Sequence, residues 1–277
     1  MTPATGLHPS VSYETYATWD AANISKLKPL RRSALHCKHQ IENPREETTA
    51  LLMGLALHAS VFEPAKFETQ FAVIPKFDRR TKDGKAAHEQ AMAENAGKTI
   101  LDEEMMANVT GMAEAIKASR AAARFVNAPG QCELSAVWQD DATGLTCKAR
   151  FDKLATLAKP VIVELKSTRD ACPSSFAKDI ANLGYAAQAA FYKDAHDKIT
   201  GTEAHHVFIA VENSAPFAVA VYMLTDSSLQ TGRAEYRRWL DLYADCRASG
   251  IWPGYPDKVE LLDMPAWAQR NFNTETE

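Results

Sequence analysis

Two carboxylates and a lysine near the middle of the chain have the residue types and spacing of a hydrolytic metal site. Asp152 follows an alternating run. Twelve positions later, Glu164 and Lys166 follow the apolar run 161–163. Residues two apart in a strand share a face, so Glu164 and Lys166 should point one way and Leu165 into the core. The carboxylates of Asp152 and Glu164 suit a hard divalent cation, and the Leu165 carbonyl could add a ligand. The Lys166 side chain could orient or deprotonate an attacking water.

The same residues also have an ordinary explanation, because the pattern E-x-K is common at strand edges. In that case Glu164 and Lys166 would form a solvated ion pair. The preceding run Val161-Ile162-Val163 is apolar and β-branched, which is typical of a buried strand. This composition favours a site at the end of a core strand.

Strands and helices alternate in the C-terminal half of the chain. The turn-forming run 140–144 between two alternating segments predicts a β-hairpin. We expect strands at 132–138, 145–154, 161–166, 206–212 and 217–224, and helices at 174–197 and 226–249. This order predicts an α/β fold, with a central mixed sheet flanked by helices and a helical N-terminal extension.

The N-terminal half is mainly helical. Asn23 or Ser25 is suited to cap a first helix, and Pro44 to begin a second that runs from Arg45 to about Phe62. Gly54 within it would let another element approach closely. Further helices are expected at 86–96 and 102–124. We expect a single domain with four parts: an extended arm at 1–22, a helical part at 23–126, a catalytic core at 127–250 and a wrapping tail at 251–277.

Composition narrows the class of function. The 277-residue chain has a net charge of −4, which argues against simple electrostatic coating of nucleic acid but permits a local basic groove or a ring. No apolar run approaches the roughly 18 residues that span a bilayer, and the N-terminus has no signal-peptide pattern. We therefore expect a cytoplasmic protein with no membrane partner.

The five cysteines are widely spaced without a CxxC, which argues against disulfides and a structural zinc site.

Five motifs occur in an order that resembles the PD-(D/E)xK nuclease superfamily. They are MGLALHASVF with His58, QCELS with Glu133, KARFD with Asp152, VELKST with Glu164 and Lys166, and YAAQAAFY with Gln188 and Tyr192. Within the superfamily the chain resembles the exonuclease VIII (RecE) type, which is related to the RecB nuclease domain and lambda exonuclease. The ordered set covers roughly residues 20–270 and is more specific than any single motif.

The resemblance implies a restriction-endonuclease-like core and a role for each acidic residue. His58 would join Asp152 and Glu164 at the metal, and Glu133 is a further candidate ligand. Two of these residues have structural alternatives. His58 could be a hydrogen-bonded core histidine, and Glu133 could be an ordinary strand carboxylate. The position of Glu133 on an alternating strand nevertheless suggests that it faces the same site as Asp152.

The resemblance also implies residues that contact the scissile phosphate. Gln188 and Tyr192 lie one helical turn apart and would both face it, whereas structurally Tyr192 could simply pack and Gln188 be solvated. Arg150 could contact a phosphate, or it could pair with Glu133 or Glu164.

Two further groups of arginines could bind DNA. Arg31 and Arg32 could belong to a pocket for a 5′-terminal phosphate, as an N-terminal arginine does in lambda exonuclease-like enzymes, or could lie on a solvated helix face. Arg79 and Arg80 begin the basic segment 79–85, which could contact the duplex backbone or be an ordinary surface loop.

The predicted function is that of a Mg²⁺-dependent deoxyribonuclease, with Mn²⁺ as a substitute. The resemblance implies a 5′→3′ exonuclease that acts on linear double-stranded DNA and leaves 3′ single strands for recombination. It also implies a homo-oligomeric ring and a single-strand annealing partner. A non-catalytic DNA-binding recombination protein and an endonuclease of the same fold are the alternatives.

Overall fold

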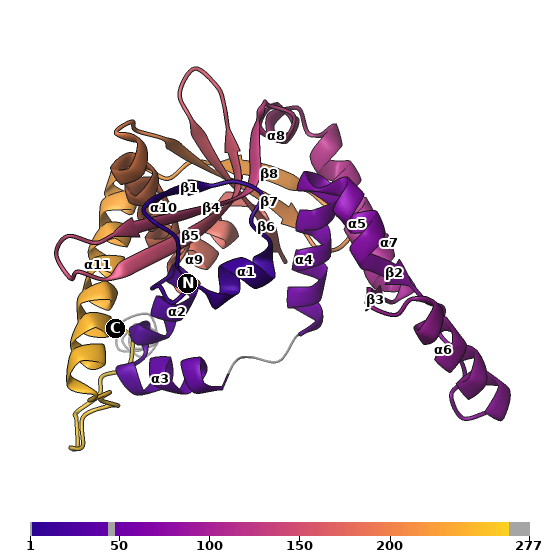
Figure 1. Cartoon of the computed structure of the whole chain (residues 1–277), viewed down its shortest axis with the longest axis horizontal. Helices are drawn as coiled ribbons and strands as arrows, with labels where there is room; N and C mark the ends of the chain where they lie inside the picture. Colours follow the sequence, from indigo (N-terminus) through magenta and orange to yellow (C-terminus); the bar gives the residue numbers. More distant parts are fainter. Residues whose placement is uncertain (1, 44–47, 266–277) are drawn as a thin grey trace, which may run out of the picture.

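A six-stranded mixed sheet forms the centre of the computed structural model, which describes residues 2–43 and 48–265 (Figure 1). The strand order is β1-β4-β5-β6-β7-β8. β6 and β7 are parallel, and the other neighbours are antiparallel. The strands are β1 (Gly6–His8), β4 (Gly130–Gln139), β5 (Thr146–Ala155), β6 (Val161–Thr168), β7 (His205–Glu212) and β8 (Val219–Tyr222). A separate parallel pair joins β2 (Phe71–Val73) to β3 (Thr99–Leu101).

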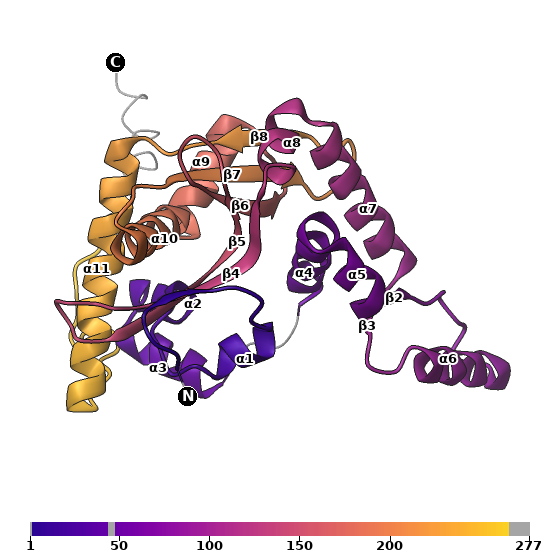
Figure 2. The same cartoon turned by 45° about the horizontal axis from the view of Figure 1, so that its top comes forward.

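Helices cover both faces of the sheet, as the α/β prediction requires (Figures 1 and 2). One face packs against α2 (Ile24–Leu27), the 3₁₀ helix η1 (Lys28–Arg31), α3 (Ala34–Glu42), α9 (Pro173–Asn182), α10 (Tyr185–Thr200) and α11 (Asp226–Ser249). The other face packs against α4 (Thr49–Phe62), α7 (Glu103–Ala118) and α8 (Arg120–Val126). The remaining helices are α1 (Tyr13–Thr18), α5 (Pro64–Gln70) and α6 (Lys82–Glu94). No helix within the described ranges is long and apolar enough to cross a membrane.

Alternation along β6 sends its side chains into two separate cores. Ile162 packs with residues of α10 and α11, whereas Val163 and Leu165 pack with those of α4 and α7. All three side chains are buried. Leu165 therefore points into the core and leaves Glu164 and Lys166 on the α10 side, as the two-residue period predicts.

Several boundaries differ from those expected. The extended arm expected at 1–22 instead contributes β1 and α1, and the buried Lys148 ammonium donates to the carbonyls of Tyr16 and Trp19 at 2.7 and 2.8 Å. The helix expected at 174–197 is divided at Gly184, whose φ of +65° is the left-handed conformation that glycine readily adopts. The helix expected from Arg45 begins at Thr49 with Thr48 as its cap, and residues 44–47 lie outside the described ranges.

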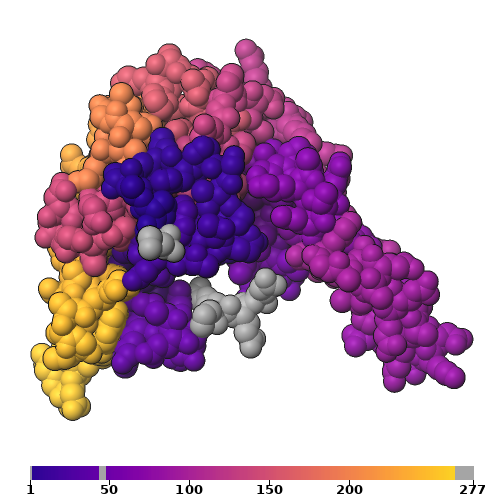
Figure 3. Space-filling model, in the orientation of Figure 1, coloured from indigo at the N-terminus to yellow at the C-terminus, as the bar shows by residue number. Residues whose placement is uncertain are grey.

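A helical projection extends from the body of the molecule. It comprises residues 76–98 with α6, and Figures 2 and 3 show it reaching away from the sheet beyond β2 and β3. No residue of α6 is buried. A solitary helix of this length is only marginally stable in water, so α6 gains little stability from packing against the body of the molecule.

The close packing of α10 against α11 depends on Gly232 in α11. A Cβ atom there would lie 2.2 Å from the Ala186 carbonyl oxygen and 2.7 Å from the Ala187 nitrogen. Because these are backbone atoms of α10, the Gly232→Ala variant must push the two helices apart. We expect it to lower the free energy of unfolding in urea by about 1–3 kcal/mol.

Gly54→Ala is the matched control for this experiment. Within the described residues, no non-local heavy atom lies within 4 Å of a Cβ placed at Gly54, which corrects the expectation of a close neighbour there. Alanine in a helix interior should instead raise the free energy of unfolding by about 0.5–1 kcal/mol. Equal effects of the two substitutions would contradict this account.

Candidate active site

The site is built where β5 and β6 separate. Their backbone pairing ends at Lys153 and Val163, and the next residue on each strand is Asp152 or Glu164. The two carboxylates therefore follow the last paired positions, and we call this place the fork. Beyond it the Leu165 N–H donates to Asp152 Oδ2 at 2.8 Å, which replaces a backbone–backbone bond.

His58 reaches the fork from α4, on the opposite face from α10. Its Nε2 lies 3.1 Å from the Leu165 carbonyl oxygen, which can only accept, so Nε2 carries the proton. Its Nδ1 therefore presents a lone pair to Asp152 Oδ2 at 3.4 Å. Burial and the nearby Lys166 ammonium lower the pKa of His58 to about 4, so the ring is neutral. A neutral imidazole is the form that binds metals.

Glu133 completes a group of three residues that could hold a metal ion. It stands opposite Asp152 in the β4–β5 register, but the pairing is interrupted there and its φ is +51°. A non-glycine residue in this conformation is strained by about 1–3 kcal/mol, and such strain often occurs at functional sites. One ligand atom each from Glu133, Asp152 and His58 lies within 4.8 Å of the others. Glu133 thus faces the same space as Asp152, as its strand position predicted.

Glu164 faces the other side of the fork. Its Oε1 accepts from Lys166 Nζ at 2.5 Å and from Gln188 Nε2 at 2.6 Å. Its Oε2 is buried and has no hydrogen-bond partner among the described residues. A buried carboxylate oxygen without a partner is costly, so this atom is free to accept a ligand that the chain does not supply.

The charges of the fork are strongly coupled. Burial and the Glu164 carboxylate raise the pKa of Asp152 well above its ordinary value of 3.8. Burial acts in the same direction on Glu164, but the Lys166 ammonium outweighs it and lowers that pKa. Burial opposes the charge of Lys166, yet Glu164 and Asp152 raise its pKa to about 12. Lys166 is therefore an ammonium that can orient a water or stabilise negative charge, but cannot remove a proton in this state.

The residues fit a hard divalent cation. The lone pair of His58 Nδ1 and the oxygen Asp152 Oδ2 face each other, an arrangement that needs either a proton on Asp152 or a cation nearby. The unpartnered Glu164 Oε2 supplies a further oxygen. Carboxylates with one imidazole suit Mg²⁺ or Mn²⁺ better than a soft metal. The Leu165 carbonyl, also predicted as a ligand, accepts from His58 in this structure.

Gln188 and Tyr192 lie on the face of α10 that covers the fork. Gln188 contacts Glu164 directly, so it is not the solvated residue of the structural alternative. Tyr192 is buried, its ring meets Phe151 edge-on at 5.3 Å, and burial and Glu164 raise its pKa well above 10. It also lines a cavity of about 200 Å³ together with Tyr13, Tyr16, Asn23, Ile24, Ser25, Lys148 and Arg150.

Arg150 pairs with a carboxylate, which was one of its two predicted roles. Its Nε donates to Glu133 Oε2 at 2.7 Å, and Nη1 donates to the Val11 carbonyl and Ser135 Oγ at 2.9 and 3.0 Å. These bonds hold Glu133 in place and connect it to the N-terminal segment. They also occupy most of the donors that a phosphate would need.

The other predicted arginines are not in the fork. Arg31 donates to the carbonyls of Ala181 and Asn182, both at 2.7 Å, and so fixes η1 to the end of α9. Arg32 is exposed. Arg79 is exposed in the segment that leads into α6, and the neighbouring Arg80 pairs with Asp78 at 2.9 Å.

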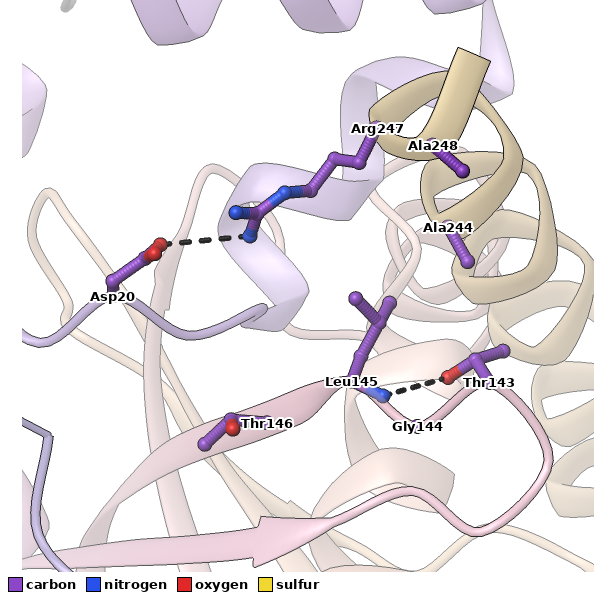
Figure 4. A pocket seen from close by; sticks show the side chains of 8 residues that line it. All are labelled: Asp20, Thr143, Gly144, Leu145, Thr146, Ala244, Arg247 and Ala248. Atoms are coloured by element: carbon purple, nitrogen blue, oxygen red, sulfur yellow. Dashed lines mark hydrogen bonds and ion pairs between the residues drawn. The ribbon is translucent and has the colours of Figure 1, made fainter.

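A cavity of about 430 Å³ lies apart from the fork, between the β4–β5 turn and the end of α11. Figure 4 shows Arg247 reaching across it towards Asp20, and these side chains form an ion pair at 3.5 Å. Leu145 and the small side chains Ala244 and Ala248 form much of the remaining wall. Asp20 is the one carboxylate among the described residues of this lining, so these residues do not form a set of metal ligands.

Two residues near the fork had no predicted role. Lys28 donates to Gln188 Oε1 at 3.2 Å, and its Nζ lies 5.2 Å from the centre of the Tyr185 ring. Lys166 Nζ lies 4.8 Å from the same ring centre. Tyr185 belongs to the predicted helix, but no local pattern points to Lys28, which is far away in sequence.

The chain is similar to a protein family and to solved structures. The model of a family described as a PDDEXK-like domain of unknown function matches residues 23–265. A crystal structure of a candidate exonuclease from Eubacterium rectale superposes with a TM-score of 0.59 over 97% of this chain and 100% of that chain, at 12% identity, which shows a shared fold. The structure of SSO0001 aligns at 14% identity over 69% of this chain and 85% of that chain. Its TM-score of 0.29 is too low to indicate a shared fold. No curated protein matches the sequence.

The raised pKa of Asp152 predicts a stability effect that depends on pH. A carboxyl whose folded-state pKa is raised contributes stability at low pH that is lost as pH rises through that pKa. Asp152→Asn should therefore raise the thermal midpoint in EDTA at pH 8, and the gain should shrink towards pH 4. Mn²⁺ at about 100 times its dissociation constant should stabilise the wild type by about 2.7 kcal/mol and the variant much less. A variant that is less stable than the wild type at pH 8 would rule out this charge assignment.

Proposed function

Because the chain belongs to the family of PDDEXK-like domains of unknown function, we propose that it is a metal-dependent deoxyribonuclease. The restriction-endonuclease-like α/β core predicted from the sequence is confirmed by this family and by the shared fold. The finer proposal is a 5′→3′ exonuclease on linear double-stranded DNA that leaves 3′ single strands for recombination. It rests on the resemblance of the ordered motifs to the RecE type.

The main support for this proposal is the fork, where the candidate metal ligands and the Lys166 ammonium lie together at the end of one strand. Asp152, His58 and Glu133 would hold Mg²⁺, or Mn²⁺ in its place, with Glu164 Oε2 as a further ligand. When bound, the cation supplies a Lewis acid for the phosphodiester and lowers the pKa of a bound water.

The remaining side chains act on the water and the phosphate. The Lys166 ammonium orients the attacking water and offsets the negative charge that grows on the phosphate. Gln188 fixes Glu164 through its amide, and the Tyr192 phenol stays neutral beside them. The phenol can therefore donate a hydrogen bond to a phosphate oxygen.

The chain has a net charge of −4, which repels the negatively charged backbone of DNA as it approaches the fork. The α6 projection offers exposed cations at the N-terminal end of α6, namely Arg79, Arg80, Lys82 and Lys85. These suit the backbone of a duplex that enters the fork. A ring of several copies around DNA, a cytoplasmic location and a single-strand annealing partner belong to the same proposal and rest on the resemblance.

Digestion of labelled duplexes tests the activity and its direction. With Mg²⁺, the purified protein should release label quickly from 5′-labelled linear duplex, slowly from 3′-labelled duplex, and leave covalently closed circles intact. Lys166→Ala should lower the rate by at least about 10²-fold, because it removes a charge that acts mainly in the transition state. Cutting of circles would indicate an endonuclease, and binding without any cleavage in Mg²⁺ or Mn²⁺ would indicate a non-catalytic protein.

The α6 projection should affect binding rather than chemistry. Arg79→Ala combined with Arg80→Ala should raise KM for duplex DNA about 3–10-fold and leave kcat nearly unchanged. The slope of log affinity against log salt should become shallower by about one for each DNA phosphate that the variant no longer binds.

The control for this variant is Arg238→Ala combined with Arg247→Ala. Both residues lie on α11, on the other side of the sheet from the α6 projection (Figure 1). Their removal changes the net charge equally, so a similar rise in KM would mean that only overall charge matters.

A further inference from the structure

Lys28 enters the fork from a part of the chain that the nuclease motifs do not include. It is the first residue of η1, and its ammonium donates to Gln188 Oε1 at 3.2 Å. This ammonium and that of Lys166 both lie close to the Tyr185 ring, at 5.2 and 4.8 Å from its centre. Two lysines from distant segments therefore approach the same small region.

We propose that Lys28 is a positioning residue, which fixes the amide of Gln188 and through it the Glu164 carboxylate. The inference rests on the proposed nuclease function and deepens it. Lys28 does not need to touch the substrate or the metal in this role.

The side-chain amide of Gln188 can occupy its site in two orientations. An ammonium can only donate, so Lys28 requires the amide oxygen Oε1 on its side. The NH₂ group then points to Glu164 and donates to Oε1 at 2.6 Å. In the flipped orientation the amide oxygen would face the carboxylate and the NH₂ group the ammonium, so both contacts would become repulsive.

The effect on Glu164 follows from this orientation. With Gln188 and Lys166 both donating to Oε1, the second oxygen Oε2 has no partner among the described residues. The chain thus holds one oxygen of Glu164 and leaves the other free. Groups that orient a ligand in this way typically change metal affinity or activity by about 10–100-fold when removed.

The surroundings of Lys28 do not explain its presence by stability alone. It is half-buried, and within residues 2–43 and 48–265 no carboxylate lies at ion-pair distance from it. Burial and the Lys166 ammonium lower the pKa of Lys28 to about 7. A half-buried ammonium without a paired carboxylate destabilises a fold, and such residues are often kept for function.

A double-mutant cycle tests whether Lys28 acts through Gln188. Lys28→Met keeps the unbranched side chain up to the ε position and removes the donor. In the wild-type background it should reduce the cleavage rate in Mg²⁺ and the affinity for Mn²⁺, measured by calorimetry, by about 10–100-fold. In the Gln188→Ala background it should change both by less than about twofold, since the group on which it acts is gone.

Thermal denaturation and a surface variant complete the experiment. Lys28→Met should not lower the thermal midpoint in EDTA, which separates positioning from a structural role. Lys38→Met, at a partly exposed lysine that pairs with Glu42, should leave rate and affinity unchanged. An equal loss in both backgrounds, or none in the wild-type background, would overturn the proposal. If the wild type cleaves no DNA, the proposed function fails, whereas Mn²⁺ affinity still tests the positioning role.

Discussion

Two buried carboxylates at one strand fork are the constraint on which this structure depends. Asp152 and Glu164 lie side by side where β5 and β6 separate, and neither can be charged there without compensation. The chain compensates Glu164 with Lys166 and Gln188. Within the described residues it supplies no charged partner for Asp152, which lies beside the neutral His58 imidazole, so the charge of Asp152 must be offset by a proton or by a cation. Asp152 is therefore neutral when it carries a proton, and its carboxylate form needs a cation nearby.

The scaffold meets this constraint from both faces of the sheet. α4 brings His58 to the fork from one side, and α10 brings Gln188 from the other. The position of α10 depends in turn on its close packing against Gly232 of α11. Strain at Glu133 and unpaired charge at Lys28 reduce stability locally, and both are placed where they shape the fork.

Charge outside the fork is arranged differently from charge inside it. The chain has a net charge of −4, whereas four exposed cations occur within residues 79–85, at the N-terminal end of α6. Arg150 and Arg31, which the sequence offered as phosphate contacts, are instead occupied within the protein. Guanidinium groups that join distant segments fix the N-terminal elements against the sheet and helices that form the site.

The sequence by itself determined the features that depend on local periodicity. It indicated the hairpin, the buried β6 and the common face of Glu164 and Lys166, because side chains alternate along any strand. It left open which partner each polar group would choose. The tertiary structure decided that Arg150 pairs with Glu133, and that Lys28 reaches Gln188 across 160 positions. Such choices depend on distances of a few ångströms between distant segments, and these are fixed only when the helices pack on the sheet.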